Sequence, residues 1–236
     1  MDILMPSISS VIKEYSQLEL PDKEDYDYYL ARDSRIFYLE SVIYKDDDEY
    51  SQVSQIIKSI ININVEDAGI PVEDRSSIIV MTDSPGGDLD LAFSLADVIK
   101  ASVTPCYTVV LSEAMSAAFI IFLAGHKRFL FPHSQLLCHQ GRLENMSGNS
   151  DEISAATKNY KDTLNKMREY ILENTTIDAK TFAKYQKKDW YISPKQAVEE
   201  YGIADKIIGS LADIGIGNID KNNKRVKSKK ENKEGQ

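Results

Sequence analysis

The chain has 236 residues, of which 42% are hydrophobic, and this is enough to bury one core without requiring two domains. Its formal net charge is −9, but the last sixteen residues hold seven Lys or Arg against two Glu, which leaves −14 on residues 1–220. Because the folded part is so acidic, nucleic acid is not expected as a partner. No apolar run reaches the roughly 20 residues that a membrane span needs.

The two ends of the chain differ from the part between them. Residues 1–25 lack a periodic pattern, so we expect them to be mobile. Asp2 stands where a secretory signal has positive charge, so we expect a cytoplasmic protein. Residues 218–236 are basic and almost devoid of apolar side chains, which predicts a disordered tail. One folded domain is expected over residues 26–217.

Within that domain, strand and helix patterns alternate, which is typical of an α/β fold. Short apolar runs predict strands at residues 35–39, 77–81, 106–111, 136–138 and 203–208. Helical spacing predicts helices at residues 51–68, 117–125, 151–175 and 178–186, one after the glycines at 86 and 87, and one from Pro194. An acidic loop is expected at residues 45–50.

Two of these helices have an apolar face that predicts core residues. In the helix at 51–68 this face comprises Val53, Ile56, Ile57, Ile60, Ile61 and Val65. In the helix after the two glycines it comprises Leu91, Leu95, Val98 and Ile99.

The two cysteines, Cys106 and Cys138, lie in apolar, strand-like runs. Their number and spacing fit neither a disulfide framework nor a metal site, so we expect reduced core residues and neither a metal nor a cofactor. Cys138 is adjacent to His139, but neighbouring residues on a strand face opposite ways. A cysteine nucleophile is therefore not expected.

Ser116 lies between small residues at the start of an apolar run that predicts a buried helix. The free N–H groups and the positive dipole end of that helix would stabilise negative charge beside the serine. Small residues on both sides resemble the tight turns that carry serine nucleophiles. The alternative is that Ser116 merely caps the helix.

Residues 82–87, TDSPGG, predict a sharp turn between a strand and a helix. Because the strand that leads to Ser116 follows one helix later, both turns are expected to open at the same edge of the sheet. The backbone N–H groups of Gly87 and Ala117 would then form an oxyanion hole beside the Ser116 hydroxyl.

Of the three histidines, His139 alone follows a predicted buried strand, whereas His126 and His133 are expected at the surface. A histidine in this place is either a general base or a structural residue with satisfied hydrogen bonds.

The helix at residues 151–175 has a narrow apolar stripe along some six turns. Such a stripe suits packing against a second copy of the chain better than burial in a monomer. The stripe comprises Ile153, Ala156, Tyr160, Leu164, Met167 and Ile171.

Four separated strings in this order resemble the proteolytic subunit of the Clp protease (ClpP), over about residues 26–209. They are SPGG, the AMSAAF around Ser116, LLCHQG and DWYISPKQAVEEYGIADKII, and AMSAAF is most similar to the phage-type branch. The resemblance implies the α/β ClpP/crotonase-like fold of repeated ββα units, with a protruding handle helix at about residues 151–175. It also implies a serine endopeptidase of an ATP-dependent protease.

By the same resemblance, the nucleophile is Ser116, the general base His139 and the acid that orients it Asp189. From the residues alone Asp189 could not be chosen among so many carboxylates. The oxyanion donors fall on the backbone of Gly87 and Ala117. Substrate-binding positions fall on Gly86, Gly141 and Arg142.

The resemblance further implies that copies of the chain associate into heptameric rings and that two rings stack. Unfolded proteins or peptides are the implied substrates, enclosed by the rings. An AAA+ unfoldase is the expected partner, with no nucleic acid and no membrane. Two alternatives stay open: a non-catalytic ring subunit, and a crotonase-type acyl-CoA enzyme on the same fold. Ala117 and Ala118 follow the nucleophile where common members have Met and Gly, which leaves backbone donors intact but alters the pocket.

Overall fold

The computed structural model describes residues 30–44, 51–141 and 147–216. The chain divides into two units, one of residues 28–209 and another of which residues 210–216 are described. The expectations for residues 1–25, the loop at 45–50 and the tail at 218–236 lie outside the described residues. Within the second unit, Leu211–Ile214 form the short 3₁₀ helix η2, with Ser210 as its capping residue.

A mainly parallel sheet organises the larger unit. Its strand order is β1-β2-β3-β4-β7, with every neighbouring pair parallel. These strands are β1 (Ile36–Ile43), β2 (Ile78–Gly87), β3 (Cys106–Met115), β4 (Lys127–Leu130) and β7 (Lys206–Ile207). β5 (Gln135–Cys138) continues beside the end of β3 in parallel, and β6 (Trp190–Ile192) pairs with β5 antiparallel. The expected α/β class is confirmed.

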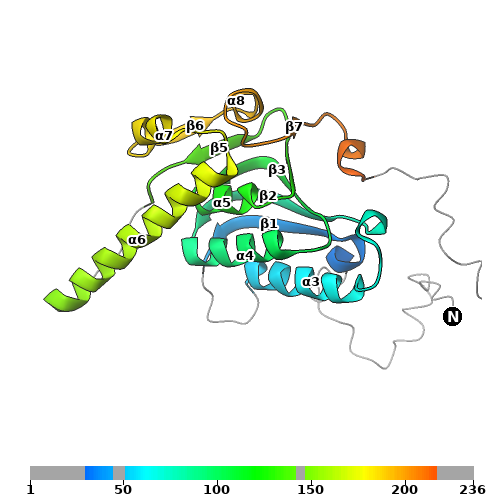
Figure 1. Ribbon diagram of the computed structural model, residues 1–236, viewed down its shortest axis with the longest axis horizontal. Coiled ribbons are helices and arrows are strands. Elements are labelled where there is room, and N and C mark those ends of the chain that lie inside the picture. The colour runs from blue at the N-terminus through cyan, green and yellow to red at the C-terminus, as the bar shows by residue number, and fades with distance from the viewer. Residues whose placement is uncertain (1–29, 45–50, 142–146, 217–236) are drawn as a thin grey trace, which may run out of the picture. The chain divides into compact units, whose positions relative to one another are not determined.

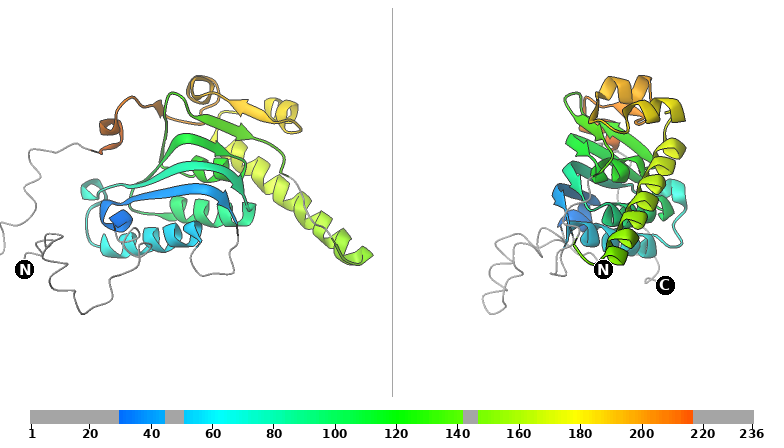
Figure 2. Two further views of the ribbon diagram at one scale, coloured as in Figure 1. Left: turned by 180° about the vertical axis from the view of Figure 1, so that it is seen from behind. Right: turned by 90° about the vertical axis from the view of Figure 1, so that its left-hand side faces the viewer.

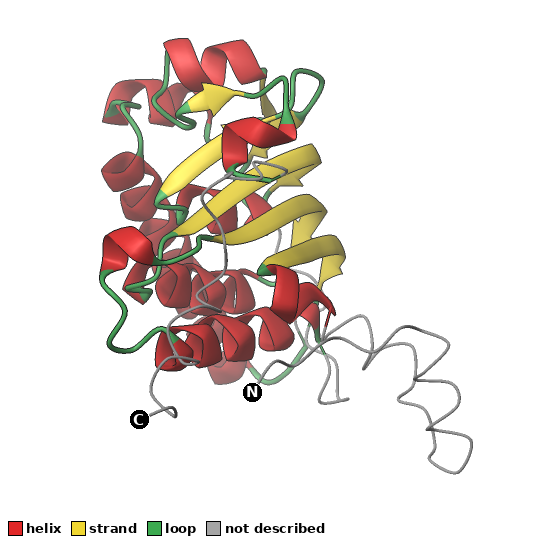
Figure 3. Cartoon of the chain, turned by 90° about the vertical axis from the view of Figure 1, so that its right-hand side faces the viewer, coloured by secondary structure: helices red, strands yellow, loops and turns green. Residues whose placement is uncertain are grey.

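Helices cover one face of this sheet, as Figure 1 and Figure 3 show. They are α3 (Gln52–Glu66), α4 (Leu89–Ala101) and α5 (Ala117–Leu123). All seven residues of α5 are buried, as its apolar sequence predicts. The short 3₁₀ helix η1 (Val72–Asp74) joins α3 to β2.

The C-terminal half of the unit adds three helices. The 25-residue α6 (Ser150–Asn174) extends beyond the end of the sheet (Figure 2), and its N-cap Asn149 and Glu152 form a capping box. α7 (Ala179–Tyr185) and α8 (Pro194–Glu199) follow, each started by a capping side chain, Asp178 and Ser193. Among the described helices, none is both long and apolar enough to cross a membrane.

The predicted core face of α3 was partly wrong, and that of α4 was incomplete. On α3, Ile61 and Val65 are 50% and 69% exposed, whereas Ile63 is buried. The helix carries two overlapping rows of aliphatic residues, and the row that faces β1 and α4 is Val53, Ile56, Ile60 and Ile63. On α4, the predicted Leu95 and Ile99 are buried, Leu91 and Val98 are half-buried and pack against the core, and Ala92 and Ala96 are buried as well.

Two strand boundaries also differ from the sequence prediction. β2 does not end at Met81 in a sharp turn but continues to Gly87, because its pairing continues on both sides, with Ile43 opposite Gly87 and Ala114 opposite Ser84. The predicted strand at 203–208 is reduced to the two residues of β7, which pair with Phe129 and Leu130 at the end of β4.

Candidate active site

Ser116 lies between the end of β3 and the first residue of α5. Its backbone has φ 54° and ψ −118°. A positive φ is uncommon for residues other than glycine, and residues with such strained backbones are found mainly at functional sites. Although Ser116 occupies the N-cap position, its side chain makes no capping hydrogen bond. The capping interpretation is therefore wrong, and the hydroxyl is available for another partner.

That partner is His139, whose Nε2 lies 2.7 Å from the Ser116 Oγ. The sheet accounts for this contact: Met115 at the end of β3 is opposite Leu137 in β5, so Ser116 and His139 both lie just beyond paired residues. The Ser116 N–H also donates to the Leu137 carbonyl at 2.9 Å. The His139 side chain is 21% exposed, which leaves it open to a ligand on one side.

Asp189 lies near the other ring nitrogen of His139, Nδ1. Cys138 is opposite Trp190 in the antiparallel pair of β5 and β6, so the next positions outward are His139 and Asp189. The Asp189 Oδ1 lies 3.5 Å from the His139 Nδ1, an ion-pair distance longer than a hydrogen bond. Its side chain is 55% exposed. The strand register thus selects this carboxylate among the many acidic residues.

Gly86 in β2 brings the backbone of this strand against the serine turn. A Cβ built at Gly86 would lie 2.4 Å from the Met115 carbonyl oxygen and 2.9 Å from the Ala117 nitrogen, so only glycine fits there. Gly87 and Ala117 both line the cavity that contains Ser116 and His139. Because Ala117 is the first residue of α5, its N–H has no intrahelical acceptor.

This cavity, the active-site cleft, has a volume of about 760 Å³ and lies between the start of α4 and α6. Gly141 lines it, and the Gly141 carbonyl accepts a hydrogen bond from the Tyr160 hydroxyl. Gly86 does not line the cleft but contacts residues 115–117, and Arg142 is outside the described residues. The remaining lining residues of the cleft are Pro85, Asp88, Leu89, Asp90, Ala156, Asn159, Tyr160, Thr163, Leu164 and Met167.

Sequence reasoning missed most of the residues that α6 contributes to this cleft. Tyr160, Leu164 and Met167 were predicted as part of a self-association stripe, because an apolar face alone does not reveal what it packs against. No sequence signal identified Asn159 or Thr163, which lie beside that stripe and line the cleft.

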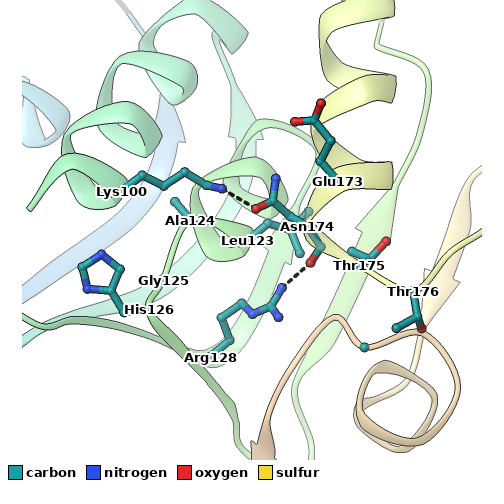
Figure 4. Close-up of a pocket in the computed structure, with 11 residues that line it drawn as sticks. Lys100, Leu123, Ala124, Gly125, His126, Arg128, Glu173, Asn174, Thr175 and Thr176 are labelled. Carbon is teal, nitrogen blue, oxygen red and sulfur yellow. Dashed lines mark hydrogen bonds between the residues drawn. The ribbon is translucent and has the colours of Figure 1, made fainter.

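A second cavity, of about 570 Å³, lies where α4, α5 and α6 end, and shares no lining residue with the active-site cleft. In Figure 4, Lys100 and Arg128 reach toward Asn174 from different elements. Lys100 donates to the Asn174 side-chain oxygen, and Arg128 donates to the Asn174 carbonyl at 2.7 Å. Burial lowers the pKa of Arg128. Cations at helix C-termini complement the helix dipoles, which explains this cluster structurally.

The cysteines take no part in the site. Both are free and buried, and burial raises the pKa of each thiol to about 12. Neither forms a thiolate near neutral pH, so Cys138 is no nucleophile despite its position beside His139. Within the described ranges, no group of three His, Cys, Asp or Glu side chains gathers as a bound metal would require.

Comparison with known proteins points to one family. A family model described as Clp protease matches residues 25–210. The ATP-dependent Clp protease proteolytic subunit 2 of Treponema denticola is 37% identical over 139 residues, which are 58% of this chain and 68% of that protein. The ATP-dependent Clp protease proteolytic subunit 1 of Protochlamydia amoebophila is 28% identical over 188 residues, 77% of this chain and 84% of that protein.

Proposed function

The chain belongs to the Clp protease family, and from that premise we propose that Ser116, His139 and Asp189 form its catalytic triad. Its relatives are proteolytic subunits, and the chain is a serine-type peptidase, a hydrolase. The observation that carries the assignment of residues is the 2.7 Å contact between the Ser116 Oγ and the His139 Nε2 inside a cleft. The phage-type branch suggested by AMSAAF stays a prediction.

In the proposed reaction, His139 Nε2 takes the proton of the Ser116 hydroxyl while the oxygen attacks the carbonyl carbon of a peptide bond. His139 then gives this proton to the leaving amine, and an acyl-enzyme remains on Ser116. Water, activated by the same imidazole, attacks the ester and releases the second peptide.

The charge that develops on the carbonyl oxygen falls between the backbone N–H groups of Gly87 and Ala117, which we propose as the oxyanion hole. A donor of this kind is worth about 3 kcal/mol in the transition state. Asp189 holds the proton on the His139 Nδ1 and stabilises the imidazolium. Its 3.5 Å separation shortens when the ring becomes charged, since catalytic contacts are often long before substrate binds.

The substrate is proposed to be an unfolded protein or peptide in an extended conformation. Gly86 keeps the backbone of β2 close to the nucleophile, and Gly141 offers backbone groups at the rim of the cleft. Arg142 is proposed as a third binding residue on the resemblance of the sequence alone.

Proteins of this family typically form rings and work with ATP-dependent Clp unfoldases. For this chain we propose heptameric rings stacked in pairs, with an AAA+ unfoldase that feeds the enclosed sites. Support comes from α6, where Ile153 is 39% exposed and only Met167 and Ile171 of the apolar stripe are buried. Ala156, Tyr160 and Leu164 line the active-site cleft, so the part of the stripe that is available to a second copy is its exposed start at Ile153. A cytoplasmic location is proposed because both cysteines are unpaired, as in a reducing compartment.

The experiment combines Ser116→Ala with a fluorophosphonate probe. We expect the variant to lose peptide cleavage and probe labelling while its native mass equals that of the wild type. Retained cleavage by Ser116→Ala, or labelling of the wild type at another serine, would overturn the assignment of the nucleophile. Failure of the purified wild type to cleave any peptide would favour a non-catalytic ring subunit.

A further inference from the structure

The segment that carries His139 lies beyond the last paired residue of the sheet. β5 pairs with β3 up to Leu137 and with β6 up to Cys138, so residues 139–141 have left the ladder. Among the described residues, a Cβ built at Gly141 would meet nothing within 4 Å, so no side chain packs against that side of the backbone. A hydrogen bond to this segment therefore restrains it where side-chain packing does not.

One such restraint comes from α6. The Tyr160 hydroxyl donates to the carbonyl oxygen of Gly141, two residues after His139, and both residues line the active-site cleft. Tyr160 is half-buried, whereas residues 151–155 and 161–162 of the same helix are exposed. The contact therefore joins an otherwise exposed stretch of α6 to the segment that holds the imidazole.

The position of the Tyr160 hydroxyl is itself fixed by the core. Met167 and Ile171, further along α6, are 7% and 0% exposed and anchor the helix in the main hydrophobic cluster. Tyr160 lies seven residues, about two turns, before Met167, so the anchored end of the helix sets where the phenol ring stands. The anchored helix α6 thus holds Tyr160, and Tyr160 in turn holds the segment of His139.

We infer that Tyr160 is a positioning residue for the peptidase reaction: its hydrogen bond to Gly141 holds the His139 segment so that Nε2 meets the Ser116 hydroxyl. This inference rests on the proposed triad. Tyr160 contributes no proton and no charge to the reaction, and acts through the geometry of His139. Loss of its hydroxyl should therefore lower the rate of the chemical step more than the binding of substrate.

The test is Tyr160→Phe, which removes one oxygen atom and keeps the ring. The matched control is Tyr170→Phe on the same helix, because the buried Tyr170 hydroxyl has no hydrogen-bond partner among the described residues. Steady-state cleavage of a fluorogenic peptide gives kcat and KM, and fluorophosphonate labelling reports the reactivity of Ser116 without peptide binding. Thermal unfolding and native mass are measured on all three proteins.

For Tyr160→Phe we expect kcat and the labelling rate to fall together about five- to tenfold, the order expected when one orienting hydrogen bond is lost, with KM within about twofold of the wild type. Tyr170→Phe should keep wild-type kinetics. Wild-type kinetics in Tyr160→Phe, a rise in KM at unchanged kcat, or a loss explained by a changed native mass would each overturn the inference. Wild-type protein that is not labelled at Ser116 would instead refute the triad itself.

Discussion

Gly86 and Ser116 are in contact across two neighbouring strands, at a distance that leaves no room for a side chain on the glycine. A Cβ built at Gly86 would lie 2.8 Å from the Ser116 Cβ and closer still to the Met115 carbonyl oxygen. Gly86 also has φ +95°, a conformation that other residues rarely adopt. The turn that carries the nucleophile is thus shaped by a residue from another strand.

Replacement of Gly86 by Ala should displace Ser116. Since a shift of about 1 Å at a catalytic atom costs on the order of 10²-fold in rate, we expect peptide cleavage to fall by at least that factor. The free energy of unfolding should fall by about 2 kcal/mol from strain and the clash with backbone atoms. Gly209→Ala is the control, because a Cβ there meets nothing within 4 Å. Activity equal to the wild type in Gly86→Ala would contradict this account.

Asp189 is the member of the proposed triad with the loosest contact, 3.5 Å from His139 and 55% exposed. Asp189→Asn removes the charge that stabilises the imidazolium and places an amide N–H donor beside Nδ1, so the tautomer of the neutral imidazole is no longer fixed. We expect kcat to fall about 10²-fold, with KM nearly unchanged and with fluorophosphonate labelling slowed. Glu199→Gln is the control, because Glu199 is exposed and pairs with Lys195 at 3.8 Å. Equal kcat in the two variants would remove Asp189 from the mechanism.

Much of this site could be predicted from the sequence, because it depends on local patterns. The apolar run after Ser116 predicts a buried helix, and the short apolar run before His139 predicts a strand, so both side chains were expected at element ends. The distance between them depends on the register of β3 against β5, which no local pattern encodes. Their meeting was therefore a hypothesis until the pairing was known.

The register of β5 with β6 is likewise not encoded in any local pattern, and for that reason only family resemblance indicated Asp189.

The residues that α6 contributes to the cleft could not be predicted either. Tyr160 was predicted on a stripe for self-association, yet its hydroxyl bonds to Gly141. Periodicity identifies an apolar face but not its partner, and a hydroxyl at the edge of such a face has no sequence signal at all.

Asp67 gives the fold a pH-dependent stability. The Arg35 guanidinium donates two hydrogen bonds to its carboxylate, at 2.8 and 2.7 Å, and the Thr104 hydroxyl donates another at 2.8 Å. The bond with Arg35 is the main reason that the pKa of Asp67 lies below its ordinary 3.8. Stability from this group is therefore present above pH 3.8 and is lost as the pH falls through the lower, folded-state pKa.

Asp67→Asn should lower the free energy of unfolding at pH 7 by about 3 kcal/mol, because Arg35 is left without its buried counter-charge. The difference from the wild type should shrink as the pH falls below about 3.8, since the unfolded wild-type chain then binds a proton, and it should shrink further as the pH passes the lower folded-state pKa and the native carboxyl becomes neutral. Urea denaturation at several pH values measures both effects. A difference that stays constant down to pH 2 would show that Asp67 does not act through its charge.

The cysteines should be chemically silent in the folded protein. Because burial raises the pKa of Cys106 and Cys138 to about 12, the thiolate is scarce at pH 8 and the sulfur is shielded. We expect iodoacetamide to leave both cysteines unmodified and peptide cleavage intact, and to modify both once urea unfolds the chain. Mass spectrometry counts the adducts, and rapid modification of the native protein would contradict the buried placement.

The exposed start of the α6 stripe supplies the last prediction. Ile153 is 39% exposed and lies on the face that we propose for contact between copies. Ile153→Glu places a charge in that contact, and burial of an unpaired charge is costly, so the native mass should fall toward smaller species. Ala155→Glu adds the same charge to an exposed position on the opposite side of the helix, and should keep the wild-type mass. Both variants should keep the circular dichroism spectrum of the wild type, because neither position belongs to the core. An unchanged mass in Ile153→Glu, or an equal loss in both variants, would mean that copies of the chain do not meet through this stripe.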